Sequence, residues 1–242
     1  MSEKTIVEMV KEKEKKRVSE VVRKIYSLVG YDTFMVFGPT GSGKTSFALW
    51  LAHQFADSGL KVYYIDSERN LSKIPKHENI EYVYTPVFDE LYNYVRNLPK
   101  AHLYILDSIG TPVLAAYAES SMYEKGTMLL KMVTMMNYLK IATYRYKAIA
   151  LITNQPVSPY GKEKVSEEDL RPVGAKSLYL CKVIWRTRIV TTTPSETLCE
   201  ITTWRDRRYG RGKKIANIRI RGMNAATGFP PPSAPLPAPP MA

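Results

Sequence analysis

The chain has 242 residues, of which 45% are hydrophobic and 24% charged, and its formal net charge is +12. This length can bury the core of one α/β domain and is too short for two large ones. Because the first twenty residues are charged throughout and no run of eighteen apolar residues occurs, we expect neither a secretory signal nor a membrane span, and a cytoplasmic location. The positive charge favours an anionic partner such as nucleic acid or a lipid surface.

The N-terminal part of the chain predicts a helix, a strand and a second helix. Residues 3–28 carry apolar side chains at helical spacing, and the run KEKEKKR within them is typical of a solvated face or a docking surface. A short β-rich run follows at 31–37, and residues 45–56 have helical character, with Gly59 as the expected cap.

Strand and helix signals then alternate. The predicted strands are 61–66, 81–86, 102–107 and 147–155, and the predicted helices are 88–98 and a Met-rich segment at roughly 119–146. This alternation predicts a parallel sheet with helices on both faces. Residues 156–173 are expected to form a loop.

Three final β-rich stretches, 181–190, 197–204 and 214–222, predict antiparallel strands added at one edge of the sheet. The expected fold class is therefore α/β, with a mostly parallel central sheet flanked by helices and an antiparallel C-terminal meander. The two cysteines, Cys181 and Cys199, lack the spacing of metal ligands, and we expect two buried thiols.

The predicted domain organisation has three parts. Residues 1–28 form a charged N-terminal helix, 29–223 the core, and 224–242 a Pro-rich tail that we expect to be extended or disordered. The tail is either a ligand for a partner or inert.

Residues 37–46 read FGPTGSGKTS and match the phosphate-binding pattern G-x-x-x-x-G-K-[ST] between a strand and a helix. The loop N–H groups and the helix N-terminus would face phosphate oxygens. Lys44 would contact the β- and γ-phosphates, and the Thr45 hydroxyl would bind Mg²⁺. The alternative is a Gly-rich turn without a ligand. The expected nucleotide-binding residues are Gly38, Pro39, Thr40, Gly41, Ser42, Gly43, Lys44, Thr45 and Ser46.

Two acidic residues follow predicted strands. Asp107 ends the strand 102–107 and is a candidate carboxylate behind the metal, or else a strand-end aspartate that caps the next segment. Glu68 follows the strand 61–66. Because parallel strands present their carboxyl ends to one crevice, Glu68 is expected near the phosphates, where it could orient water. The alternative for Glu68 is an exposed loop glutamate.

Taken together, five segments resemble the RecA/RadA recombinase superfamily, most closely archaeal RadA paralogues and RadA-like ATPases related to KaiC. They are FGPTGSGKTSFAL, VYYIDSER, YILDSI, ALITNQPV and RPVGAKSLYLCKVIWRTRI, in the family's order over roughly residues 29–221. The resemblance implies a RecA-type P-loop ATPase core that uses ATP and Mg²⁺.

The resemblance also implies roles for individual residues. Glu68 would activate water, Lys44 would take part in catalysis, and Asp107 would join Thr45 at the metal. Gln155, with Asn154 beside it, would sense the γ-phosphate and pass its state to a DNA-binding loop that corresponds to residues 156–174. A glutamine amide can hydrogen-bond to phosphate and swing away afterwards.

Some family features have no counterpart in this sequence. No helix-hairpin-helix domain precedes the core, and residues 1–30 contain no Phe-x-x-Ala polymerisation motif. The loop after Gln155 balances its cations with Glu163, Glu167, Glu168 and Asp169. We therefore expect an accessory factor or regulator. It could form an oligomer, but the sequence does not predict a filament.

Residues 204–221 form a strongly basic segment with one acid, Asp206, and interleaved Trp204 and Tyr209. Cations track a phosphate backbone and aromatic rings can stack on unpaired bases, so a hairpin here could contact DNA. Alternatives are a solvated hairpin with Trp204 in the core, or an arginine finger that reaches a neighbouring subunit's γ-phosphate. The candidate DNA-binding residues are Arg205, Arg207, Arg208, Arg211, Lys213 and Lys214.

The expected function is that of an ATP-binding, ATP-hydrolysing protein that binds DNA, single-stranded DNA above all. It would assist or regulate homologous recombination and DNA repair, with a RadA-type recombinase or other recombination proteins as partners and no membrane. The alternatives are a KaiC-like signalling or adaptor module, in which ATP controls protein partners and DNA plays no part, and an ATP-binding scaffold with little turnover.

Overall fold

The computed structural model describes residues 18–69, 76–157, 169–174, 179–206 and 208–221. Most of the predicted N-terminal helix, the Pro-rich tail, Arg207 and the centre of the predicted DNA-binding loop lie outside these residues. Within them, no helix is both long enough and apolar enough to cross a membrane.

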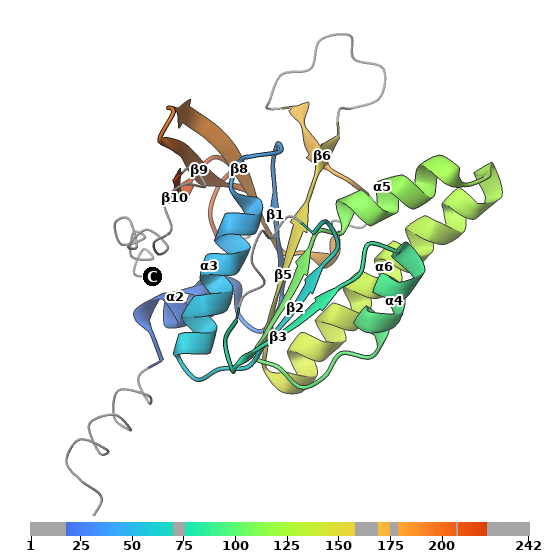
Figure 1. Cartoon of the computed structure of the whole chain (residues 1–242), viewed down its shortest axis with the longest axis horizontal. Helices are drawn as coiled ribbons and strands as arrows, with labels where there is room; N and C mark the ends of the chain where they lie inside the picture. The colour runs from blue at the N-terminus through green and yellow to red at the C-terminus, as the bar shows by residue number, and fades with distance from the viewer. Residues whose placement is uncertain (1–17, 70–75, 158–168, 175–178, 207, 222–242) are drawn as a thin grey trace, which may run out of the picture.

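The molecule is organised around one eight-stranded sheet with the order β10-β9-β8-β1-β5-β4-β2-β3 (Figure 1). Strands β3, β2, β4, β5, β1 and β8 run parallel, and β8, β9 and β10 form an antiparallel meander at one edge. The predicted fold class is thereby confirmed. The strands are β1 (Thr33–Phe37), β2 (Val62–Asp66), β3 (Ile80–Tyr84), β4 (Leu103–Asp107), β5 (Ile149–Asn154), β8 (Val183–Thr192), β9 (Glu196–Arg205) and β10 (Lys214–Arg221).

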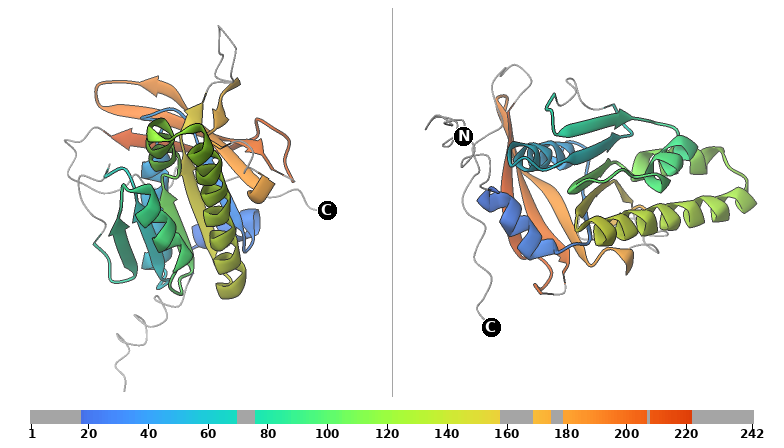
Figure 2. Two further views of the ribbon diagram at one scale, coloured as in Figure 1. Left: turned by 90° about the vertical axis from the view of Figure 1, so that its right-hand side faces the viewer. Right: turned by 90° about the horizontal axis from the view of Figure 1, so that it is seen from below.

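Helices cover both faces of this sheet, as Figures 1 and 2 show. One buried cluster joins one face to α4, α5 and α6, and a second joins the other face to α2 and α3. The inner strands β1, β2, β4 and β5 are buried along their whole length, which explains their continuous apolar sequences. The helices are α2 (Glu20–Val29), α3 (Lys44–Asp57), α4 (Phe88–Arg96), α5 (Gly110–Glu119) and α6 (Met122–Tyr146).

The predicted helix over residues 3–28 does not run unbroken to its end. Helix α2 begins at Glu20. Ser19, directly before it, has a non-helical backbone, and its side chain accepts a hydrogen bond from the Val22 N–H at 3.2 Å. Ser19 is therefore the N-cap of α2. The buried side chains of α2, including Val22 and Ile25, pack into the core beside α3.

The predicted Met-rich helix is the second of two consecutive helices. Helix α5 was not predicted, because Gly110 and Pro112 resemble a break. Both lie in its first turn, where the N–H that proline lacks has no intrahelical partner. Ser121 then starts α6 through a capping box with Glu124. Met132, Met135 and Met136 of α6 are buried in the core.

The predicted loop 156–173 contains a short antiparallel ribbon of β6 (Pro156–Val157) and β7 (Arg171–Pro172). Strands of two residues have no sequence periodicity, so composition alone indicates a loop. Both cysteines are free and buried, as predicted.

Candidate nucleotide-binding and hydrolysis site

The phosphate-binding pattern lies between the carboxyl end of β1 and the first turn of α3. Gly43 is the residue before α3 and has a left-handed backbone with φ +86°. Residues with a Cβ adopt this conformation only at a cost in free energy. Lys44 begins the helix. The loop thus leads directly into a helix N-terminus whose first N–H groups have no intrahelical partner, which is the geometry that binds anions.

The loop is held against strand β8. The Ser42 hydroxyl donates to the Pro39 carbonyl at 2.7 Å and shares a 2.6 Å hydrogen bond with the hydroxyl of Thr187 on β8. The Thr187 hydroxyl also lies 3.3 Å from the Phe37 carbonyl. The sequence carries no signal for Thr187, since its contact with the loop depends on the parallel pairing of β8 with β1.

Gly38 allows this close approach. A Cβ at Gly38 would overlap the side-chain and carbonyl oxygens of Thr187, whereas a Cβ at Gly126 in α6 would meet nothing within 4 Å. We expect Gly38→Ala to lower the free energy of unfolding by about 1–3 kcal/mol, as overpacking does. Gly126→Ala should raise it by roughly 0.5–1 kcal/mol through helix propensity. Urea unfolding of both variants tests this, and equal effects would contradict the close contact.

Lys44 is buried and extends back over the loop. Its ammonium donates to the carbonyls of Gly38 at 2.8 Å and Pro39 at 2.9 Å. Burial lowers the pKa of Lys44, while the charges of Glu68 and Asp107 oppose that shift by favouring the ammonium. The two acids predicted for this site therefore lie close enough to act on the same lysine.

Asp107, at the end of β4, is buried among hydroxyl groups from three elements. Its carboxylate accepts hydrogen bonds from the Thr45 hydroxyl at 3.3 Å, from the Tyr64 hydroxyl at 2.7 Å and from the Thr153 hydroxyl. Burial raises the pKa of Asp107, and the hydrogen bonds from Thr153, Tyr64 and Thr45 oppose that shift. A hydroxyl and a carboxylate side by side at the phosphate loop are oxygen ligands of the kind that Mg²⁺ uses with nucleotide phosphates, so Thr45 and Asp107 fit this ion.

The turn after β2 directs Glu68 toward β4. Asp66 pairs in register with Asp107, and its carboxylate accepts the N–H groups of Glu68 at 2.9 Å and Arg69 at 3.0 Å. The Tyr82 hydroxyl donates to the other oxygen of Asp66 at 2.7 Å. These bonds fix the backbone that carries Glu68.

Three side chains converge on one oxygen of the Glu68 carboxylate. The hydroxyls of Ser108 and Thr111 donate to Oε1, and so does the Gln155 amide at 3.2 Å. Glu68 is therefore half-buried and bound to three neighbours, which differs from an exposed loop glutamate.

Gln155 stands where β5 leads into the β6–β7 ribbon. The Asn154 side chain accepts the Gln155 N–H at 2.8 Å and donates to the Val173 carbonyl at 3.0 Å. The Val173 N–H in turn donates to the Gln155 carbonyl at 3.0 Å. The backbone of Gln155, whose side-chain amide contacts Glu68, is thus joined to both strands of the ribbon. Gln155 directly precedes β6 and is hydrogen-bonded to Val173, which directly follows β7.

The basic turn between β9 and β10 lies at the amino ends of the parallel strands, opposite the edge of the sheet that carries the phosphate loop. The Arg208 guanidinium donates to the carbonyls of Ser27 and Leu28 in the last turn of α2, which precedes β1, whereas the phosphate loop follows β1. Cations near a helix C-terminus stabilise it, so Arg208 has a structural contact that sequence reasoning did not predict.

The aromatic residues of this segment pack within the protein. The Trp204 ring meets Phe37 edge to face at 5.5 Å between centroids, and the Arg211 guanidinium lies over the Trp204 ring, 5.7 Å from its centroid. The Lys213 ammonium lies 3.7 Å from the Tyr209 ring centroid. Lys214 pairs with Glu200 at 3.3 Å, and Arg205 is exposed at the end of β9. The DNA contacts expected of Arg205, Arg207, Arg208, Arg211, Lys213 and Lys214 remain a prediction.

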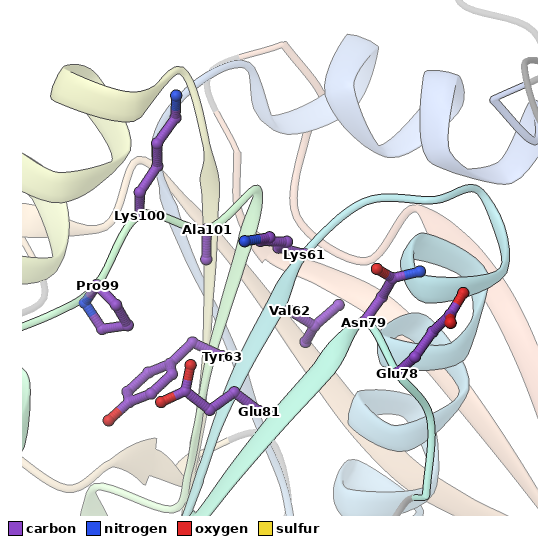
Figure 3. A pocket seen from close by; sticks show the side chains of 9 residues that line it. All are labelled: Lys61, Val62, Tyr63, Glu78, Asn79, Glu81, Pro99, Lys100 and Ala101. Atoms are coloured by element: carbon purple, nitrogen blue, oxygen red, sulfur yellow. The ribbon is translucent and has the colours of Figure 1, made fainter.

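A pocket of about 340 Å³ lies at the amino ends of β2, β3 and β4, away from the phosphate loop (Figure 3). Lys61, Lys100, Glu78 and Glu81 are among the residues that line it. It contains none of the predicted nucleotide-site residues.

Comparison with known proteins gives one kind of match. No protein-family model and no curated protein matches the sequence. Among solved structures, the chain is similar to a crystal structure of the RadB recombinase, with 21% sequence identity and a TM-score of 0.56, over 81% of this chain and 92% of that one. At this identity the match concerns architecture: the chain has an α/β fold similar to that of the RadB recombinase structure, with an antiparallel meander at its C-terminal end.

Proposed function

We propose that this protein binds ATP with Mg²⁺, hydrolyses the ATP, and binds DNA in support of homologous recombination and repair. Recombination proteins such as a RadA-type recombinase would be its partners. The observation that carries the proposal is the meeting of Lys44, the Thr45–Asp107 pair and the Glu68–Gln155 pair at the carboxyl ends of β1, β4, β2 and β5. Ligands of open α/β sheets bind at this end of the strands.

The phosphate loop would hold the triphosphate. Its N–H groups, the N-terminus of α3 and the Lys44 ammonium all favour negative charge. When a phosphate arrives, its oxygens would replace the Gly38 and Pro39 carbonyls as partners of Lys44. Thr45 and Asp107 would hold Mg²⁺, which neutralises charge on the β- and γ-phosphates.

Glu68 would position the attacking water. The water oxygen forms a bond to the γ-phosphorus, the bond from that phosphorus to the β–γ bridging oxygen breaks, and the water proton passes to the carboxylate. Ser108 and Thr111 would hold the carboxylate in one orientation through Oε1. Gln155 contacts that same oxygen and could exchange it for a γ-phosphate oxygen, which would link the nucleotide state to the β6–β7 ribbon.

A double substitution tests the positioning role of the hydroxyls. We expect Ser108→Ala with Thr111→Val to lower ATP turnover by roughly a hundredfold, because a misplacement of about 1 Å has that effect, while ATP affinity stays near that of wild type. The matched control is Thr134→Val, which removes a hydroxyl that donates to the Leu130 carbonyl within α6. Turnover and ATP titration calorimetry separate the two effects, and wild-type turnover in the double variant would refute the positioning role.

The proposed function is tested by ATPase activity measured without DNA, with single-stranded DNA and with duplex DNA. We expect turnover that requires Mg²⁺ and increases with single-stranded DNA. Turnover that no DNA changes, together with no measurable DNA binding, would contradict the recombination proposal and favour a signalling module that acts through protein partners.

A further inference from the structure

The C-terminal meander has two chemically different faces. Trp185, Ile201 and Ile215 point toward α2 and α3 and belong to the core cluster on that side. The side chains that alternate with them point the other way. In Figure 1, β8, β9 and β10 lie apart from α4, α5 and α6, the helices on that second side of the sheet.

Cations from two strands of the meander surround one acid on this second face. Arg188 on β8 pairs with Glu200 on β9 at 2.8 Å, and Lys214 on β10 pairs with the same carboxylate at 3.3 Å. The Glu200 side chain is 12% exposed, whereas those of Arg188 and Lys214 are 48% and 56% exposed. The acid thus lies beneath its partners, and positive charge is presented to solvent.

Two further arginines extend this surface along the strands. Arg186 lies two residues before Arg188 on β8, and side chains two apart in a strand share a face. On β10, Asn217 stands opposite Glu200, so Arg219 lies on the same side and is exposed. Glu196, at the start of β9, is the other acid that alternation places here. We call the group of Arg186, Arg188, Lys214 and Arg219 the meander face.

We propose that the meander face binds the DNA phosphate backbone, an inference that rests on the proposed function in so far as the protein binds DNA. Cations brought together from two strands, β8 and β10, match the repeated charge of a backbone without contacting bases. The β9–β10 turn is a less suitable surface, because Arg208 contacts α2 and Trp204 packs on Phe37. Of the four residues, only Lys214 is among the candidate DNA-binding residues expected from the sequence, although Arg219 lies in the same basic segment. Arg186 and Arg188 come near them only through the pairing of β8, β9 and β10.

The test compares two double variants that each remove three units of positive charge. Arg188→Gln with Arg219→Glu changes the meander face and keeps Lys214 beside Glu200. Lys61→Gln with Lys100→Glu makes the same change of charge in the pocket at the amino ends of β2, β3 and β4 (Figure 3). Binding of fluorescent single-stranded and duplex DNA is measured by anisotropy over a range of salt concentrations, with a melting curve for each variant. If the first variant does not fold, Arg219→Glu alone replaces it.

We expect the meander-face variant to weaken DNA binding on the order of tenfold at low salt. Its slope of log affinity against log salt should fall by about 1.4 for single-stranded DNA, since each lost phosphate contact removes about 0.7. The pocket variant should bind like wild type. Unchanged binding by the meander-face variant, or an equal loss in both variants, would overturn the assignment. Failure of wild type itself to bind DNA would overturn the DNA-binding part of the proposed function as well.

Discussion

Lys44→Ala is expected to reduce ATP turnover by at least roughly a hundredfold, the effect of removing one charge-stabilising donor from a water-excluded site. The ammonium is buried over the phosphate loop and donates to the Gly38 and Pro39 carbonyls. ATP affinity should fall too, because Lys44 contacts phosphates in the ground state as well as in the transition state.

Burial lowers the pKa of Lys44, so the folded protein favours the neutral amine more than the unfolded chain does. A melting curve of Lys44→Ala then separates a loss of activity from a loss of folding. Lys61→Ala, at the opposite end of the sheet, is the matched control and should retain wild-type turnover. Phosphate release and ATP titration calorimetry measure both effects, and wild-type activity in Lys44→Ala would show that hydrolysis occurs elsewhere.

Glu68→Gln is expected to separate ATP binding from hydrolysis. Glutamine has nearly the same shape, and its side-chain oxygen can still accept hydrogen bonds from Ser108 and Thr111. It cannot take a proton from water, so turnover should fall by about 10²–10⁴-fold, the usual contribution of a general base. ATP affinity should remain close to that of wild type.

Glu81→Gln, on the edge strand β3, provides the matched control for this variant. It makes the same chemical change beside the pocket of Figure 3 and should leave turnover unaltered. Single-turnover phosphate release is the appropriate measurement, because it reports the chemical step without product release. Normal turnover in Glu68→Gln would mean that the base has been assigned to the wrong residue.

The parallel core was predictable because its strands are buried on both faces. Such strands read as continuous apolar runs, and the acids at the ends of β2 and β4 mark where each strand stops. Once the strands are taken as parallel, their carboxyl ends share one edge of the sheet. The register between Asp66 and Asp107 confirms this expectation and places the turn that carries Glu68 at the same edge of the sheet as the end of β4.

Features created by tertiary contacts could not be predicted in the same way. The Tyr64 and Thr153 hydroxyls meet Asp107 only because β2 and β5 flank β4 in the sheet. Arg208 finds its partners in α2, about 180 positions earlier in the chain. Helix α5 was missed for a local reason, since Gly110 and Pro112 disfavour the interior of a helix but are tolerated in its first turn.

The central claim is that the phosphate loop, Asp107 and Glu68 act on the same triphosphate. A crystal structure with Mg²⁺ and a non-hydrolysable ATP analogue tests it most directly. The account predicts a γ-phosphate in contact with Lys44, a metal ion held by Thr45 and Asp107, and a water between the γ-phosphate and Glu68. An analogue bound in another part of the protein, or a Glu68 side chain turned away from the γ-phosphate, would contradict it.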